Sequence, residues 1–538
     1  MYILGISAFY HDSAACILYK DQIVAAIQEE RITRKKHDQS FPSHSIKRCI
    51  DIAKITPNDI DHIIFYDKPF LKFDRILETY LAFAPLGFKS FMHSFPLWVK
   101  DKLFQKNTII KNLSNLISND IDWESKLLFS EHHLSHAASA FYPSPFDEAA
   151  ILTMDGVGEW ATTSLAIGNK NTIDIHKEIK FPHSIGLLYS AFTYYLGFKV
   201  NSGEYKVMGL APYGIPKYVN RIKDNLIDIK EDGSFFLNMK YFNYCTGMTM
   251  TNKKFNDLFQ ANNRIAEDKL GQREMDIAAS LQIIIEEIVL RLCKSIRKET
   301  NLNNLCLSGG VALNCVANGK IQSSNIFDNL WIQPASGDAG GALGAAYVAY
   351  YLHLQNKRSV DKKQKDSMRG SYLGTQYSVL DTKKILDISN ANYHEKADSE
   401  IINETSNLLK QNKAIGWFSG KMEFGPRALG ARSIIADPRS ATMQKILNLK
   451  VKFRESFRPF APSILREDLE EWFNLNVDSP YMLLVSDIVS SRKKEMTLEE
   501  EKLFGIDKLN IIRSDIPAIT HVDYSARIQT VHKETNQR

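Results

Sequence analysis

Three histidines stand within five residues in the stretch SEHHLSHAASAFYPSPF, which runs from residue 130 to 146. His132 and His136 are four residues apart, so on a helix they would lie on one face. Two imidazoles at that spacing can bind one divalent metal ion, with carboxylates from elsewhere completing the site. The alternative is an ordinary helix start, with Ser130 as the N-cap, Glu131 in the first turn and solvated histidines after it. The spacing alone leaves both interpretations open.

Two acidic loops resemble each other in position. Asp155, in TMDGVGEW, follows an apolar run and stands beside two glycines. A carboxylate there can bind a metal ion or approach a phosphate closely, although ordinary turns also use aspartate. His11 and Asp12 stand in the loop AFYHDS. A histidine in such a loop is a candidate general base, and a locally hydrogen-bonded imidazole is the alternative.

Two glycine turns each connect a strand-like segment to a helix-like one. Gly309, Gly310 and Val311 follow the run LCLS, and Asp338 lies in the second turn, SGDAGG. Backbone N–H groups at such a helix start bind phosphate or a nucleotide. Neither turn is a Walker loop or a clean GxGxxG motif, and Asp338 would also suit an N-cap. The pair together favours a nucleotide site more than either turn alone.

The segment NSGEYKVMGLAPYG, residues 201–214, places Glu204 and Lys206 between glycines. Few helix signals are present, so the segment is expected to be a loop that either contributes to the site or has a purely structural role.

The densest group of cations lies in GKMEFGPRALGARSIIADPR and LKVKFRESFRPFAPSIL. These cations stand beside glycine, proline and apolar residues, unlike the alternating charges of a solvated helix. Converging guanidinium groups bind phosphates bidentately. A buried ion-pair network with Glu423, Asp437 and Glu455 is the alternative. The cations are Lys421, Arg427, Arg432, Arg439, Lys450, Lys452, Arg454 and Arg458, and Arg527 follows near the C-terminus.

The elements that would position these residues follow from hydrophobic periodicity. The runs YILGIS, AACILY and IVAAIQ predict three strands, and AILTM followed by residues 162–167 repeats the design with an acid in each turn. Two such hairpins suggest an internal duplication. Apolar spacing predicts a helix over residues 277–298. Residues 354–370 are polar, basic and aperiodic, and they predict a domain boundary.

Composition narrows the class of protein. The chain has 538 residues, 44% of them hydrophobic, and a net charge of +5, which suits anionic small substrates and does not call for nucleic acid. Six scattered cysteines without a CxxC pair argue against zinc fingers and disulfides and favour the cytoplasm. The apolar window at residues 79–98 contains two prolines, a lysine and a histidine, so we expect buried or lid-forming helices there and no membrane span.

Ten motifs in a fixed order identify a family. They are GISAFYHDSAACIL, EERITRKKHD, HHLSHAASAFYPSPF, TMDGVGEW, SGEYKVMGLAPYG, SGGVALN, SGDAGGALGAA, MEFGPRALGARSIIADPR, FRESFRPFAPSIL and THVDYSARIQTV. Together they resemble the O-carbamoyltransferases of nodulation-factor, antibiotic and toxin biosynthesis, the NodU/CmcH family. The resemblance spans nearly the whole chain.

The resemblance implies an α/β protein with two catalytic parts. Residues 1–353 would form a duplicated actin-like ATPase (ASKHA) domain with the metal and nucleotide sites, residues 354–370 a linker, and residues 371–538 a YrdC-like α/β domain. The second domain would form a carbamoyl adenylate from carbamoyl phosphate and ATP. The first would transfer the carbamoyl group to a hydroxyl of a small natural product.

Carried over motif by motif, the resemblance also implies roles for the candidate residues. His132, His136, Asp155 and Asp338 would bind a divalent metal ion, expected to be iron, although two nitrogens and two oxygens also suit zinc or manganese. His133 falls outside this pattern and is expected to tolerate replacement. The remaining roles are His11 as the base, Gly309, Gly310, Val311 and Asn314 with Glu204 and Lys206 at the nucleotide, and Lys421, Arg427, Arg432, Arg458 and Arg527 at the phosphates of carbamoyl phosphate and Mg-ATP.

The expected partners are carbamoyl phosphate, ATP and a small hydroxyl-bearing acceptor in the cytoplasm, with no nucleic acid and no membrane. The oligomeric state stays open, a homodimer included.

A hydrogenase-maturation carbamoyltransferase is an alternative that the sequence disfavours. It would carry an acylphosphatase domain and cysteine-rich zinc motifs, whereas here the first hairpin begins at Tyr2 and no CxxC exists. A threonylcarbamoyl-type tRNA-modification enzyme is disfavoured by the weak net charge and the lack of a basic-aromatic stripe. A non-catalytic actin-like module would not need the arginine cluster.

Overall fold

The computed structural model describes residues 1–98, 103–266, 268–361 and 365–537. The chain forms two compact units, Met1–Ser367 and Met368–Arg538. The expected linker, residues 354–370, spans this boundary, but part of it is held by the first unit. The Arg358 guanidinium donates hydrogen bonds to the carbonyl oxygens of Phe141 and Ser144, each at 3.0 Å.

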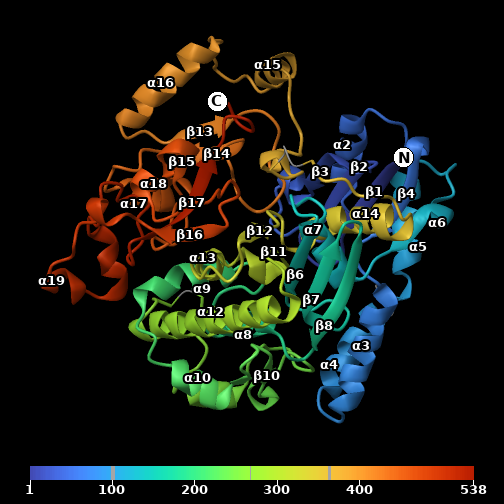
Figure 1. The fold of residues 1–538 in the computed structure, drawn as a ribbon, viewed down its shortest axis with the longest axis horizontal. Coiled ribbons are helices and arrows are strands. Elements are labelled where there is room, and N and C mark those ends of the chain that lie inside the picture. The colour runs from blue at the N-terminus through green and yellow to red at the C-terminus, as the bar shows by residue number, and fades with distance from the viewer. Residues whose placement is uncertain (99–102, 267, 362–364, 538) are drawn as a thin grey trace. The chain divides into compact units, whose positions relative to one another are not determined.

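The first sheet of the first unit has the order β3-β2-β1-β4-β5 (Figure 1). Its first three strands form an antiparallel meander, and β4 and β5 run parallel to β1. The central strands are almost wholly buried, as their continuous apolar runs require. The strands are β1 (Tyr2–Ser7), β2 (Ala14–Tyr19), β3 (Gln22–Gln28), β4 (Ile60–Phe65) and β5 (Leu127–Phe129).

The second sheet repeats this design. Its order is β8-β7-β6-β11-β12, with an antiparallel meander followed by two strands parallel to β6. Order and direction match the first sheet strand for strand, so the predicted duplication is confirmed, and the arrangement agrees with an actin-like fold. The strands are β6 (Glu148–Met154), β7 (Ala161–Asn169), β8 (Thr172–Lys180), β11 (Asn304–Ser308) and β12 (Asn329–Ile332).

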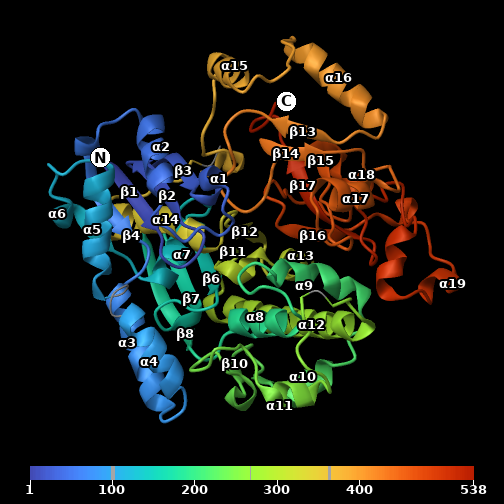
Figure 2. The same ribbon diagram turned by 180° about the vertical axis from the view of Figure 1, so that it is seen from behind.

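Two equivalent helices follow the last strands of the two sheets and interlock between them (Figures 1 and 2). Helix α7 (His132–Phe141) follows β5 but packs on the second sheet, and α14 (Asp338–Tyr347) follows β12 but packs on the first. The two helices also pack on each other. Gly344 makes this possible, since a Cβ there would stand 1.7 Å from the Ser135 carbonyl oxygen.

One long helix, α12 (Gln272–Thr300), lies in the second half of the first unit. The predicted helix over residues 277–298 is confirmed within α12, whose apolar positions are buried. The expectation of a loop at residues 201–214 is wrong in part, because Glu204–Leu210 forms helix α9. There Glu204 stands at the first helical position and its carboxylate accepts the N–H of Gly203 at 3.1 Å, which a glycine-bracketed sequence does not reveal.

The apolar window at residues 79–98 is mostly helical, as expected, with a turn at residues 83–87. It spans the end of α3 (Pro69–Ala82) and all of α4 (Phe88–Trp98). Several of its apolar side chains are exposed, among them Leu81 at 76% and Phe88 at 67%, so burial does not account for them. No helix among the described residues combines the length and the apolar character needed to cross a membrane.

Shorter elements complete the first unit. They are α1 (Glu30–Thr33), α2 (Ser43–Ala53), α5 (Gln105–Leu116), α6 (Trp123–Lys126), α8 (Ile185–Tyr195), α10 (Val219–Asn225), β9 (Ile227–Ile229), β10 (Phe235–Leu237), α11 (Lys253–Leu258) and α13 (Cys315–Ser323).

The second unit is also α/β but has smaller sheets. One pairs β13 with β14, and the other has the order β15-β17-β16. Helices α15 and α16 contain no fully buried residue. The YrdC-like identity of this unit remains a prediction. Its elements are α15 (Val379–Ile388), α16 (Asp398–Lys410), β13 (Ile415–Phe418), β14 (Arg432–Ile435), α17 (Met443–Ile446), β15 (Ser463–Leu465), α18 (Leu469–Trp472), β16 (Leu484–Asp487), α19 (Leu498–Glu501) and β17 (Ser525–Val531).

Candidate metal centre

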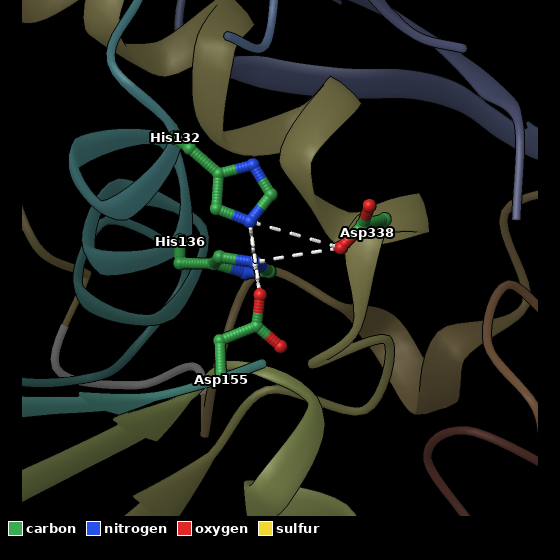
Figure 3. Close-up of side chains that lie close together, drawn as sticks. All are labelled: His132, His136, Asp155 and Asp338. Carbon is green, nitrogen blue, oxygen red and sulfur yellow. Dashed lines mark hydrogen bonds and ion pairs between the residues drawn. The ribbon is translucent and has the colours of Figure 1, made fainter. Parts of the chain in front are cut away.

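Four side chains from three separate segments converge at the carboxyl ends of the parallel strands (Figure 3). His132 and His136 come from the first two turns of α7, as their spacing predicted. Asp155 directly follows β6, and Asp338 is the first residue of α14. Their ligand atoms all lie within 4.8 Å of one another. Both histidines and Asp338 are at most 1% exposed.

The distances between the donor atoms suit one shared cation. The two Nε2 atoms are 3.1 Å apart, and Asp155 Oδ2 lies 3.0 Å from His132 Nε2 and 3.6 Å from His136 Nε2. Asp338 Oδ1 is 3.8 Å from each Nε2. Donor atoms about 2.0–2.2 Å from one ion are about 3.0–3.6 Å apart at ordinary coordination angles. The cluster is therefore close to the size of a first coordination sphere.

The hydrogen bonding of the cluster also suits a cation. Asp338 Oδ1 is a buried atom that accepts no hydrogen bond within the described chain, while Tyr66 donates to Oδ2 at 3.1 Å. Burial raises the pKa of Asp155, but its bonds with His132 and His136 outweigh this and lower it well below the usual value. The donor set of two imidazole nitrogens and two carboxylate oxygens fits iron, zinc or manganese.

The first glycine turn lies against Asp155. The Gly310 N–H donates to Asp155 Oδ1 at 2.9 Å. Gly309 has a φ of +87°, and a Cβ there would stand 2.2 Å from the Met154 carbonyl oxygen. Glycine is required at this position for both reasons. The expected helix start is instead a 3₁₀ turn over Gly310–Leu313, and α13 begins afterwards.

His11 reaches the same centre from the loop after β1. Its Nε2 is 3.8 Å from Asp338 Oδ2, and its Nδ1 is 3.0 Å from Asp12 Oδ2. The other Asp12 oxygen lies 2.8 Å from His37 Nδ1, so Asp12 bridges two imidazoles. Burial lowers the pKa of His11, but Asp338 and Asp12 outweigh it and raise the pKa to about 9. At that pKa the His11 imidazole already carries a proton near neutral pH. It can act as a base only where a positive charge compensates the charge of Asp338 and Asp12.

His133 lies outside the cluster, as expected, but the expectation that it tolerates replacement does not fit its surroundings. It is 2% exposed, and its Nδ1 is 2.9 Å from Ser164 Oγ. Burial and the charge of His132 hold the pKa of His133 well below its usual value. His133 is a neutral core residue, and polar or larger replacements should be costly.

The other predicted nucleotide residues lie on nearby helices and are engaged within the protein. Asn314 is the N-cap of α13, and its side-chain amide pairs with that of Gln282 through two hydrogen bonds of 3.0 and 3.1 Å. Glu204 Oε1 accepts a hydrogen bond from Ser190 Oγ at 2.8 Å. Lys206 Nζ lies 5.5 Å from the centre of the Phe198 ring. Val311 is half-buried in the 3₁₀ turn.

In the second unit, Arg432 is occupied by the protein itself. Its guanidinium donates to the carbonyl oxygens of Ser419, at 3.0 Å, and Thr375, at 3.1 Å, and it stacks 3.5 Å from the centre of the Phe418 ring. The buried Glu423 carboxylate accepts the backbone N–H of Arg432 at 3.1 Å. The predicted phosphate role of Arg432 therefore competes with a structural one.

Two acids of the ion-pair alternative have cation partners, but these pairs are not a buried network, since the Arg439 side chain is 65% exposed and that of Glu455 is 32% exposed. Asp437 binds Arg439 in a fork with distances of 2.6–3.1 Å, and Glu455 lies 3.7 Å from Arg458. Burial and the charges of Arg454 and Arg458 lower the pKa of Lys452, which shows that cations gather there. Of the other predicted phosphate residues, Lys421 is exposed, and Arg427 and Arg527 are half-buried.

Sequence reasoning missed Tyr66 and Glu159. Tyr66 bonds Asp338, and the Glu159 carboxylate accepts the backbone N–H of His132 at 3.1 Å. No local pattern marks either residue, because their partners lie far away in the sequence.

Comparison with known proteins places the whole chain. It matches the family model for the carbamoyltransferase N-terminus over residues 2–347 and that for the carbamoyltransferase C-terminus over residues 406–538. An uncharacterized protein of Synechocystis sp. is 58% identical over 100% of this chain and 87% of its own length. Nodulation protein NolNO of Sinorhizobium fredii is 34% identical over 99% of this chain and 71% of its own.

A solved structure of HypF from T. kodakarensis covers 66% of this chain and 48% of its own at 14% identity, but its TM-score of 0.32 is too low to carry an argument. The chain belongs to the carbamoyltransferase family and is an enzyme of carbamoyl transfer.

Proposed function

We propose that this carbamoyltransferase is ATP-dependent and that its acceptor is a hydroxyl of a small natural product. Carbamoyl phosphate and water would give carbamate and phosphate, and carbamate with ATP would give carbamoyl adenylate and pyrophosphate. The acceptor hydroxyl would then displace AMP and form the carbamate ester. The observation that carries the proposal is the buried cluster of His132, His136, Asp155 and Asp338 in a chain of this family.

Adenylation has a clear chemical purpose. The carbamate anion is a poor electrophile, and joining it to AMP gives its carbonyl a good leaving group. Cations that stabilise the charge developing on that group lower the barrier. We assign this step to the second unit, because it carries the predicted phosphate-binding residues. Lys421, Arg427, Arg458 and Arg527 are retained for this role, and Arg432 would hold the loop that carries Arg427.

The transfer step is assigned to the first unit. The four donors of the cluster would hold a divalent ion, which when bound polarises an acyl carbonyl and offsets negative charge. The Gly309–Gly310–Val311 turn would lie against the nucleotide while its Gly310 N–H holds Asp155, and Asn314 and Glu204 would support the helices behind it. Lys206 is retained as a nucleotide-side residue.

His11 would orient the acceptor and take its hydroxyl proton. The bond from its Nδ1 to Asp12 leaves Nε2 on the side of Asp338, where a substrate would lie. A general base must reach the proton it removes, and this orientation provides that reach.

The test uses the full-length protein with carbamoyl phosphate, Mg-ATP and a panel of hydroxyl acceptors, in separate reactions with Fe(II), Zn(II) or Mn(II). We expect pyrophosphate release, and AMP formation coupled to carbamate ester with a suitable acceptor. Absence of pyrophosphate under every metal condition would overturn the proposal.

Two variants separate the steps. His136→Ala should lose bound metal and carbamoyl transfer but keep pyrophosphate release, because it removes one donor of the cluster. His176→Ala, an exposed histidine on β8, is the matched control and should behave as wild type. Retained transfer in the His136 variant would show that the cluster does not serve the reaction.

A further inference from the structure

The N-terminus of α7 is capped by a residue from a distant loop. The formal N-cap, Glu131, makes no side-chain capping bond. Glu159 supplies it instead, since its Oε1 and Oε2 both accept the His132 backbone N–H at 3.1 Å. Glu159 is 7% exposed, so its hydrogen bonds with the His132 N–H are shielded from water. An anion at this end of a helix also interacts favourably with the helix dipole.

The same carboxylate joins a further segment. Oε1 of Glu159 accepts the backbone N–H of Lys68 at 2.8 Å. Lys68 stands two residues after Tyr66, whose hydroxyl donates to Asp338. Glu159 itself stands in the loop that begins with Asp155. One side chain thus ties together the segments that carry His132, Asp155 and the hydrogen-bond partner of Asp338.

Gly158 allows the loop to lie this close to α7 without crowding. A Cβ on Gly158 would stand 3.0 Å from a ring carbon of His133 and 3.1 Å from Cβ of His132. The loop backbone is fixed as well, since the Gly158 N–H donates to the Ala161 carbonyl oxygen at 2.9 Å. Glu159 is therefore presented to α7 by a hydrogen-bonded turn.

We propose that Glu159 is a positioning residue for the metal centre. Its carboxylate holds the α7 backbone at His132 in place relative to Asp155. This inference rests on the proposed function, in which the cluster binds a metal ion. Metal sites tolerate displacements of only about 0.5 Å in their donors, and loss of supporting contacts costs about 10–100-fold in affinity.

Glu131 provides a matched control. Its carboxylate lies at the same helix end and pairs with the Lys68 Nζ at 2.9 Å, but both side chains are more than 40% exposed. Glu131→Gln therefore removes a negative charge near α7 without touching the backbone N–H groups. Glu159→Gln removes the charge but keeps the reach, and Glu159→Asp keeps the charge but shortens the reach.

The experiment titrates Mn(II) into the metal-free full-length proteins and measures affinity by calorimetry and the bound ion by electron paramagnetic resonance. We expect Glu159→Gln and Glu159→Asp to bind Mn(II) at least about tenfold more weakly than wild type, with Glu131→Gln within about twofold. The thermal stabilisation produced by a fixed Mn(II) concentration should shrink in parallel in both Glu159 variants.

The outcomes are distinct. Equal affinity and an equal metal-induced Tm rise in wild type and both Glu159 variants would overturn the positioning role. A lower Tm without metal, but unchanged affinity, would show that the cap is only structural and would also overturn it. If wild type binds no Mn(II), the metal assignment in the proposed function fails first, and the inference falls with it. If Glu159→Gln does not fold, Glu159→Asp decides the result.

Discussion

Replacing Gly344 by alanine should damage the metal centre from a distance. Gly344 lies in α14, where the helix crosses α7. The added Cβ would stand 1.7 Å from the Ser135 carbonyl oxygen and 2.9 Å from the Ser139 backbone nitrogen. These are backbone atoms, so no side-chain rotation relieves the overlap.

The magnitude follows from that geometry. To reach ordinary contact the helices must separate by about 1.5 Å, and overpacking of this kind costs about 3 kcal/mol. In a unit this large, each kcal/mol lowers Tm by about 2 °C, so Tm should fall by about 6 °C. The same separation carries Asp338 away from His132 and His136, and metal affinity should fall at least about tenfold.

The assay compares Gly344→Ala with Gly337→Ala, at the N-cap of the same helix. An ideal Cβ on Gly337 has no atom within 4 Å, and its φ of −75° suits alanine. Scanning calorimetry gives Tm, and Mn(II) titration gives affinity. The Gly337 variant should stay within about 1 °C of wild type, because the added Cβ meets no neighbouring atom and changes away from packed sites usually cost less than about 0.5 kcal/mol. A Gly344 variant with the Tm and affinity of wild type would refute the idea that close helix contact holds the donors together.

Three further substitutions test other parts of the structure. Asp12→Asn should lower the transfer rate at least about tenfold, through misorientation of His11, with pyrophosphate release unchanged; equal transfer rates would contradict the role of Asp12. His133→Gln should lower Tm by about 2–6 °C in calorimetry while metal content, measured by mass spectrometry, stays at wild-type level; an unchanged Tm would restore the expectation of tolerance. Arg432→Lys should speed proteolysis within residues 368–538 of the full chain, since lysine cannot reach several carbonyl oxygens from one plane. The control, Arg439→Lys, changes an exposed fork and should leave the cleavage rate unchanged. Equal cleavage rates in the two variants would show that Arg432 does not hold its loop.

Periodicity predicted the strands and the long helix because these patterns are local. The runs at residues 2–7, 14–19 and 148–154 are continuous apolar stretches, and each became a strand. The helix over residues 277–298 shows its buried face at every turn. The spacing of His132 and His136 likewise predicted a shared face, and both Nε2 atoms do converge.

Long-range features could not be found this way. The strand end and the two glycines marked Asp155 as a possible ligand, but only the family resemblance joined Asp155 and Asp338 to the histidines, because no local pattern shows which distant residues share a site. The capping role of Glu159 could not be predicted from the sequence, because Ser130 and Glu131 already stand at the start of the helix. An arginine in a glycine-rich turn can bind a phosphate or a carbonyl oxygen, and only the fold shows that Arg432 already binds the latter.

The duplication explains why the centre lies where it does. The carboxyl ends of β1 and β6 carry equivalent loops, one with His11 and the other with Asp155, and α7 and α14 begin after equivalent strands. The packing of α7 against α14 brings the starts of both helices together with the two loops, where His132, Asp155, Asp338 and His11 meet. The copies have diverged in chemistry, because α7 brings imidazoles where α14 begins with a carboxylate. The repeated frame therefore holds unlike groups in facing positions, and it places the candidate proton acceptor, His11 Nε2, 3.8 Å from Oδ2 of the candidate metal ligand Asp338.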